Sequence, residues 1–187
     1  MLRLIDLALR GLEKVNAPIA RWGLSFSASL LALMLIVALA QILSRALFNH
    51  TLDWAEEAAR MALVWSALLA APMGYRAAGH VAITAFIEGL PPRALQLTGV
   101  IVNVLIGWIC VIFLLESVDF VARGSTIMST GLGVPMSYVY LIVPVALVAL
   151  LMVSIEAVLT LLRALLTRDV SGLLVGVVPV MHRDEEG

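Results

Sequence analysis

Three long apolar runs limit what this chain can fold into. They occupy residues 23–43, 95–115 and 138–162, and Glu156 in the last run is their only charged residue. About 20 apolar residues suffice for a helix to cross a bilayer, and the hydrocarbon interior forces such a segment to satisfy its backbone polar groups internally. The chain has 13% charged residues, about half of the roughly 25% that is usual in soluble domains. We therefore predict an all-α integral membrane protein.

A fourth span is predicted over residues 55–75, although its uncharged part, residues 61–75, is too short to cross a bilayer alone. Asp53 is a good N-cap residue, and Glu56 follows it in capping-box register. Glu56 and Arg60 are four positions apart in the order that favours pairing on a helix. Glu57 shares the positive end of the helix dipole with Glu56. This local chemistry favours a real span with a charged first turn.

The basic residues predict the orientation, because Lys and Arg accumulate in short cytoplasmic segments. One side of the predicted membrane has many more of them than the other, which places both termini in the cytoplasm and the 45–65 segment on the opposite side. The richer side holds Arg3, Arg10, Lys14, Arg21, Arg76, Arg93, Arg163, Arg168 and Arg183, and the poorer side holds Arg45, Arg60 and Arg123.

The two ends of the chain flank this four-helix domain, which covers residues 23–162. Residues 1–22 alternate charged positions with Leu2, Ile5, Leu9 and Leu12, a pattern typical of an amphipathic helix lying at the membrane interface. The same segment is acidic as well as basic, which disfavours a cleaved signal peptide. Residues 163–187 are predicted to be a cytoplasmic tail.

The chain offers no pattern typical of an enzyme, a cofactor site or a metal site. His50, His80 and His182 fall in predicted loops or in the tail, whereas a haem between membrane helices needs histidines inside facing spans. The single cysteine, Cys110, cannot form an internal disulfide. Glu156 lies well inside a span, and we expect it to share a face with Arg163 and reach the cytoplasmic surface. These features argue against an enzyme and against a carrier that works alone.

The charged block from Arg45 to Trp65 is the most informative polar feature. Charged residues at the centre of a membrane helix cost roughly 2.5–3.5 kcal/mol each on insertion scales, so these must reach water or polar partners. Two interpretations stay open: salt bridges within the chain, or a polar contact with a larger membrane partner. The second is favoured, because the chain has four apolar spans but no transport or catalytic site of its own.

The order of these residues resembles the small membrane (DctQ-type) subunit of tripartite ATP-independent periplasmic (TRAP) transporters. The resemblance runs from about residue 21 to residue 162. It departs at Thr84, where an acidic residue is usual, and at residues 70–71, where Ala-Ala replaces Gly-Ala. The matching positions are Arg45, Phe48, Trp54, Glu56, Glu57, Arg60, Trp65, Arg76, His80, Pro135, Tyr140 and Pro144.

The resemblance implies a role in the bacterial inner membrane. A periplasmic solute-binding protein would deliver an organic acid, and a large multi-span subunit would carry it inward, driven by an ion gradient that we expect to be sodium. The present chain would be a non-catalytic scaffold packed on that large subunit. The alternatives are a small exporter that functions as a dimer and a membrane-anchor subunit of a redox complex.

Overall fold

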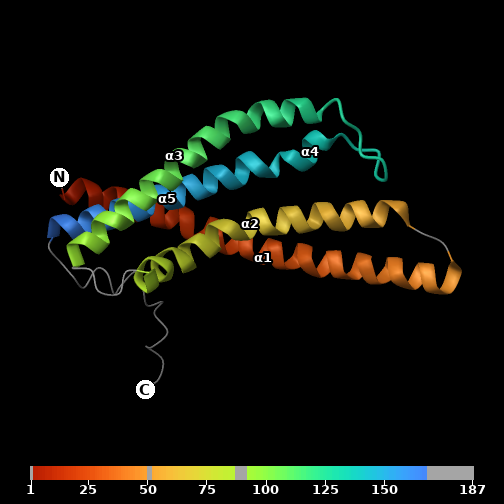
Figure 1. Cartoon of the computed structure of the whole chain (residues 1–187), viewed down its shortest axis with the longest axis horizontal. Coiled ribbons are helices and arrows are strands. Elements are labelled where there is room, and N and C mark those ends of the chain that lie inside the picture. Colours follow the sequence, from red (N-terminus) through yellow and green to blue (C-terminus); the bar gives the residue numbers. More distant parts are fainter. Residues whose placement is uncertain (1, 50–51, 87–91, 168–187) are drawn as a thin grey trace, which may run out of the picture.

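The protein is built from helices arranged as two hairpins (Figure 1). The computed structural model describes residues 2–49, 52–86 and 92–167. Helix α1 (Leu2–Phe48) pairs with α2 (Asp53–Phe86) to form the first hairpin. Helix α3 (Pro92–Gly124) pairs with α5 (Ile142–Thr167) to form the second. The short helix α4 (Met136–Tyr140) directly precedes α5. The described residues contain no strand beyond an isolated bridge between Met128 and Pro135. The predicted all-α class is confirmed.

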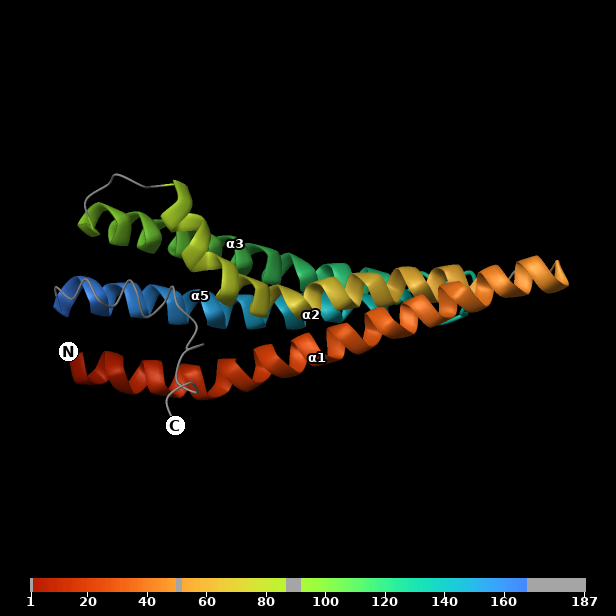
Figure 2. The ribbon, with the colours of Figure 1, turned by 90° about the horizontal axis from the view of Figure 1, so that it is seen from below.

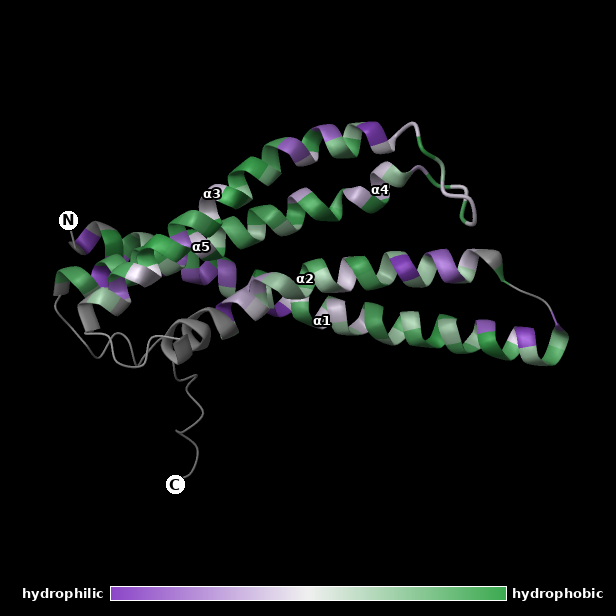
Figure 3. Ribbon diagram, in the orientation of Figure 1, coloured by the Kyte–Doolittle hydropathy of each residue, from purple (hydrophilic) through white to green (hydrophobic). Residues whose placement is uncertain are grey.

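Within the described residues, three segments are long and apolar enough to cross a membrane: Ile5–Phe48, Gln96–Gly124 and Met136–Leu166. They contain the three uncontested predicted spans. Helix α2 covers the whole predicted second span but is not among them, and it continues to Phe86, past the predicted end at residue 75. Figure 3 shows hydrophilic positions recurring toward the ends of α1, α2 and α3. The number of four spans and their orientation stay predictions.

Helix α1 is continuous where we expected a boundary near residue 22. It runs through Pro18 without interruption, although proline removes a backbone donor and commonly bends a helix. Figure 2 shows the first part of α1 lying along α5 and the remainder lying along α2. Ile5, Leu9 and Leu12 are half-buried on the same face as the buried Asn16. That face packs on protein in the structure, and the interfacial location of the segment stays a prediction.

Small residues form most of the buried core. Ala20, Ala55, Ala146 and Ala164 are buried, whereas many large apolar side chains are exposed on the outside of the helices. This distribution is expected in a membrane, because lipid is as apolar as a leucine side chain and small residues let helices approach closely. The core therefore positions the helices through close backbone contacts and through the polar side chains described next.

Candidate functional site

The predicted charged block divides into an outward and an inward part. Arg60 donates from Nη2 to Oε1 of Glu56 over 2.9 Å, and both side chains are about 70% exposed, at 73% and 70%. The predicted pair is therefore present. Arg45 and Phe48, at the end of α1, are also exposed. The structure therefore leaves all four side chains exposed on the outside of the helices.

Glu57 points toward the other hairpin. Its Oε2 accepts a hydrogen bond from the backbone N–H of Gly131 over 2.6 Å. Gly131 belongs to the loop of residues 125–135, which folds on itself through a hydrogen bond from the Ser129 N–H to the Val134 carbonyl. Gly133 in this loop has φ 65°, a conformation that favours glycine. A single residue step along α2 turns a side chain by about 100°, so adjacent glutamates face different surroundings.

Trp65 also links the two hairpins, about two helical turns after Glu57 in α2. Its Nε1–H donates to the carbonyl of Val139 in α4 over 3.0 Å. The ring also lines an apolar groove of about 450 Å³ between the hairpins, together with Leu30, Met61 and Tyr138. These contacts leave Trp65 half-buried.

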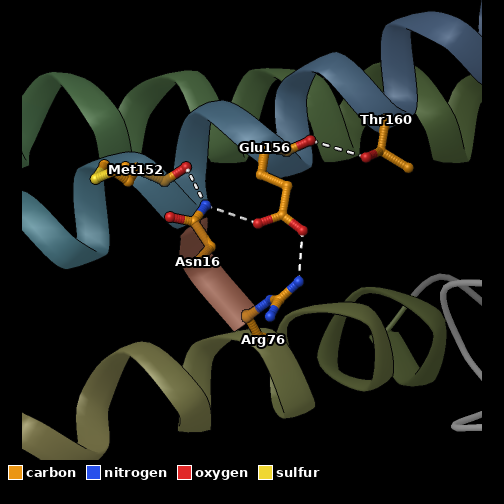
Figure 4. Close-up of polar contacts among 5 residues, drawn as sticks. All are labelled: Asn16, Arg76, Met152, Glu156 and Thr160. Carbon is orange, nitrogen blue, oxygen red and sulfur yellow. Dashed lines mark hydrogen bonds and ion pairs between the residues drawn. The ribbon is translucent and has the colours of Figure 1, made fainter. Parts of the chain in front are cut away.

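A second polar group lies near the opposite end of the bundle (Figure 4). Arg76 Nη2 lies 2.6 Å from Oε1 of Glu156, and the Asn16 Nδ2 donates to Oε2 of the same carboxylate over 2.7 Å. Asn16 also donates to the Met152 carbonyl over 3.1 Å. The side chains of Arg76 and Glu156 are only 24% and 15% exposed. This cluster ties together α1, α2 and α5.

We expected Glu156 to share a face with Arg163 and to reach the cytoplasmic surface, but the two side chains have different ion-pair partners in the structure. Arg163 was assigned to the tail, but α5 continues to Thr167 and includes it, and its Nε contacts Oδ1 of Asp6 in α1 over 2.9 Å. Glu156 turns instead toward Arg76, which sequence reasoning had assigned to the loop after the second span. Because α2 continues as a helix beyond residue 75, Arg76 is held inside the bundle.

A third polar layer, which sequence reasoning missed, lies beside this cluster. Tyr75 donates from its hydroxyl to Oδ1 of Asn103, and Asn103 donates to the Gly99 carbonyl over 2.7 Å. Ser154 donates to the Asn103 carbonyl over 2.7 Å. Asn103 is buried within the third predicted span. A polar residue inside an apolar run was the available signal for Asn103, but nothing in the sequence marked Asn16.

The remaining predicted positions have mainly local roles. Pro135 is the N-cap residue of α4, and Tyr140 in α4 stacks on Phe120 with ring centroids 4.2 Å apart. Trp54 is 45% exposed, and Pro144 is half-buried near the start of α5. His80 lies in α2, but its side chain is outside the described part of the chain.

The described residues contain no group of three or more His, Cys, Asp or Glu side chains arranged to hold a metal ion. The polar side chains form pairs and small clusters that link helices. This arrangement is suited to holding four long helices in register and to presenting one charged pair outward.

One comparison with known proteins identifies a family. The family model described as "Tripartite ATP-independent periplasmic transporters, DctQ component" matches residues 34–164. No curated protein and no solved structure matches the chain. The matched segment begins in the last third of α1, includes all of α2, α3 and α4, and ends within α5.

Proposed function

Because the chain belongs to the DctQ component family of TRAP transporters, we propose that it is the small, non-catalytic scaffold subunit of such a transporter. It would pack on the large multi-span subunit in the bacterial inner membrane. The large subunit would take up an organic acid from a periplasmic binding protein, driven by an ion gradient that we expect to be sodium. The family match carries this proposal, and the geometry of the charged block supports it.

The exposed Glu56–Arg60 pair is the best candidate for the contact with the large subunit. An ion pair in water contributes little stability, typically 0–1 kcal/mol. The Glu56–Arg60 pair therefore stabilises the monomer only slightly. The same pair at the edge of the hydrocarbon region costs free energy unless polar groups face it. A partner helix that presents opposite charges would supply those groups.

Glu57 would support this contact indirectly. It holds the 125–135 loop through Gly131, and this loop lies on the predicted periplasmic side, where the solute-binding protein would dock. We expect its loss to affect the loop and the coupling between hairpins, whereas loss of the Glu56–Arg60 pair would affect only the outer surface.

The alternative of a self-sufficient exporter gains no support from Glu156. A proton-coupled mechanism needs a carboxylate that can exchange its proton during transport. Both oxygens of Glu156 are already occupied, because Oε1 accepts from Arg76 and Oε2 accepts from Asn16. The cluster is better explained as a structural link between three helices.

The test is co-expression of the tagged chain with a large multi-span subunit and a binding protein encoded beside it. We expect the large subunit to co-purify. We also expect organic-acid uptake in proteoliposomes to require all three proteins and an inward sodium gradient. Sodium-driven uptake by this chain alone would contradict the proposal.

Three variants locate the contact within that assay. Arg60→Glu should lower recovery of the large subunit while leaving the thermal stability of the isolated chain nearly unchanged. Glu57→Gln should lower both the recovery of the large subunit and the thermal stability of the isolated chain. Arg123→Ala, an exposed residue on the same predicted side, is the matched control and should change neither. If the large subunit is recovered equally with all three variants, the charged block makes contacts only within the monomer.

A further inference from the structure

Four basic side chains share one exposed face of the first part of α1. Arg3, Arg10, Lys14 and Arg21 are spaced by seven, four and seven positions, so at about 3.6 residues per turn they point in nearly the same direction. All four are exposed, and no ion pair between described residues includes any of them. We call these four residues the basic row.

The contacts with α5 fix the depth of this part of α1 in the bundle. Asp6 contacts Arg163 over 2.9 Å, and Asn16 donates to the Met152 carbonyl over 3.1 Å. The stretch of α1 between these two contacts therefore runs antiparallel to the last part of the predicted fourth span, which ends at residue 162 (Figure 2). Two members of the basic row fall within this stretch.

The contacts with α2 fix the depth of the next part of α1. The apolar run of α1 begins at Gly23, and a Cβ atom built on Gly23 would lie 2.8 Å from the Leu69 carbonyl oxygen. Ser27 donates to the Ser66 carbonyl over 2.7 Å. The apolar run of α1 thus starts beside the second half of the predicted second span. Arg21 precedes this contact by only two residues, so it also lies beside that span and not beyond its end.

Three members of the basic row are therefore at the depth of the hydrocarbon that the second and fourth predicted spans require. Exposed cations at that depth are costly unless they reach water or polar partners. Arg21 is 15 positions from Asp6, or about 22 Å along the helix, and Asp6 lies level with the end of the predicted fourth span. Arginine side chains snorkel over shorter distances than this, so Arg21 needs a polar partner at its own depth.

We propose that the basic row is a second contact with the large subunit and binds one of its helices through carboxylates. The identity of this partner rests on the proposed function, whereas its chemistry rests on α1. Carboxylates are the groups that arginine binds best in such a position, through its planar fork of donors. Glu13 is exposed on the same helix, but it points about 100° away from Lys14 and leaves the row without a counter-charge.

The shape of the basic row favours a helix as the partner. The row extends over 18 positions, about 27 Å along the axis, so its members cannot share one layer of lipid headgroups. The acidic residues of the tail, Asp184, Glu185 and Glu186, are consecutive in the sequence and can meet only a part of the row. A helix that lies along α1 can present a carboxylate every one or two turns and meet each cation in turn.

Lys14 allows a direct test of this contact, because it is the only lysine of the chain. The tagged chain is co-expressed with the large subunit encoded beside it, and the purified complex is treated with a membrane-permeant carbodiimide. This reagent joins an amine to a neighbouring carboxylate as an amide, with loss of water. Mass spectrometry of the digested complex should identify an amide between Lys14 and an Asp or Glu in a membrane helix of the large subunit.

A matched control moves the amine off the basic row. The double variant Glu13→Lys/Lys14→Arg keeps a cation at position 14 and places the only lysine about 100° around the helix. This variant should still recover the large subunit, but the cross-link to it should be lost.

Charge reversal measures what the basic row contributes to assembly. Arg10→Glu/Lys14→Glu should lower recovery of the large subunit by roughly tenfold or more, because like charges that face each other across an interface repel strongly. The thermal stability of the isolated chain should stay nearly unchanged, since both side chains are exposed. Arg123→Glu reverses an exposed cation near the other end of the bundle and should change neither quantity.

Two results would overturn the contact and leave the proposed function intact. One is a complex in which Lys14 is cross-linked to Asp184, Glu185 or Glu186 of its own chain, or is not cross-linked at all. The other is full recovery of the large subunit by Arg10→Glu/Lys14→Glu. If the wild-type chain recovers no large subunit, the proposed function itself fails, and the basic row has no partner of this kind.

Discussion

At the scale of single residues, Glu156 shows how a charged group is accommodated inside this bundle. Burying a carboxylate is costly unless it is paired and hydrogen-bonded. Glu156 has both kinds of partner, with the Arg76 guanidinium at 2.6 Å and the Asn16 amide at 2.7 Å. Each partner comes from a different helix, so the carboxylate keeps both contacts only while α1, α2 and α5 keep their relative positions.

Removing this charge should destabilise the bundle. Glu156→Gln leaves Arg76 without a counter-charge in a largely buried position, and breaking a buried pair in this way costs about 3 kcal/mol or more. The measurement is the free energy of unfolding in detergent. Glu56→Gln, in the exposed pair, should cost less than about 1 kcal/mol. The double variant Arg76→Met/Glu156→Met should recover much of the loss, and equal costs for Glu156→Gln and Glu56→Gln would contradict this account.

The indole of Trp65 provides a second test at this scale. Trp65→Phe keeps most of the apolar ring but removes the hydrogen bond to the Val139 carbonyl, which should lower the unfolding free energy by about 1 kcal/mol. Trp108 is 66% exposed on α3, so Trp108→Phe is the matched control and should have little effect. A larger cost at Trp108 would mean that the contact between α2 and α4 is not the stabilising one.

At the scale of helices, the α1–α2 hairpin depends on close backbone approach. The Ser27 hydroxyl donates to the Ser66 carbonyl over 2.7 Å, and both serines are buried. A Cβ atom built on Gly23 would lie 2.8 Å from the Leu69 carbonyl oxygen. Such proximity is possible only where small residues face each other, which is how membrane helices without a hydrophobic driving force gain contact.

Substitution of Gly23 should therefore separate the two helices. Gly23→Ala places a methyl group against backbone that cannot rotate away, and overpacking of this kind costs about 1–3 kcal/mol. Gly74→Ala, in the same hairpin, meets nothing within 4 Å and should be neutral or slightly stabilising, because alanine favours helix over glycine. Thermal unfolding of the two variants gives the comparison, and a stabilising Gly23→Ala would refute the close approach.

At the scale of the whole molecule, the open issue is whether α2 crosses the membrane. In the part of the chain that the structure describes, three helices are apolar enough to do so without help, and α2 is less apolar because Glu56, Glu57 and Arg60 occupy its beginning. Yet α2 pairs with α1 and contacts α5. A helix packed in this way can cross with its charges near the headgroups and its polar groups directed at protein.

Site-directed labelling distinguishes the two possibilities. In a background with Cys110→Ala, single cysteines replace Asn49, Ala77 and Thr130, which are exposed. With four spans and cytoplasmic termini, a membrane-impermeant maleimide added to spheroplasts should label positions 49 and 130 but not position 77. Labelling of position 77 together with position 49 would mean that α2 does not cross.

The sequence alone determined the helical class, the three long spans, the early start of α2 and the family resemblance that the family match confirmed. These properties follow from hydrophobicity and local chemistry along one helix. Only the tertiary structure decided that Glu56 faces outward while Glu57 binds Gly131, and that Glu156 pairs with Arg76 instead of Arg163. Gly131 is 74 positions from Glu57 and Arg76 is 80 from Glu156, so these partners depend on how the hairpins cross, which no local pattern encodes.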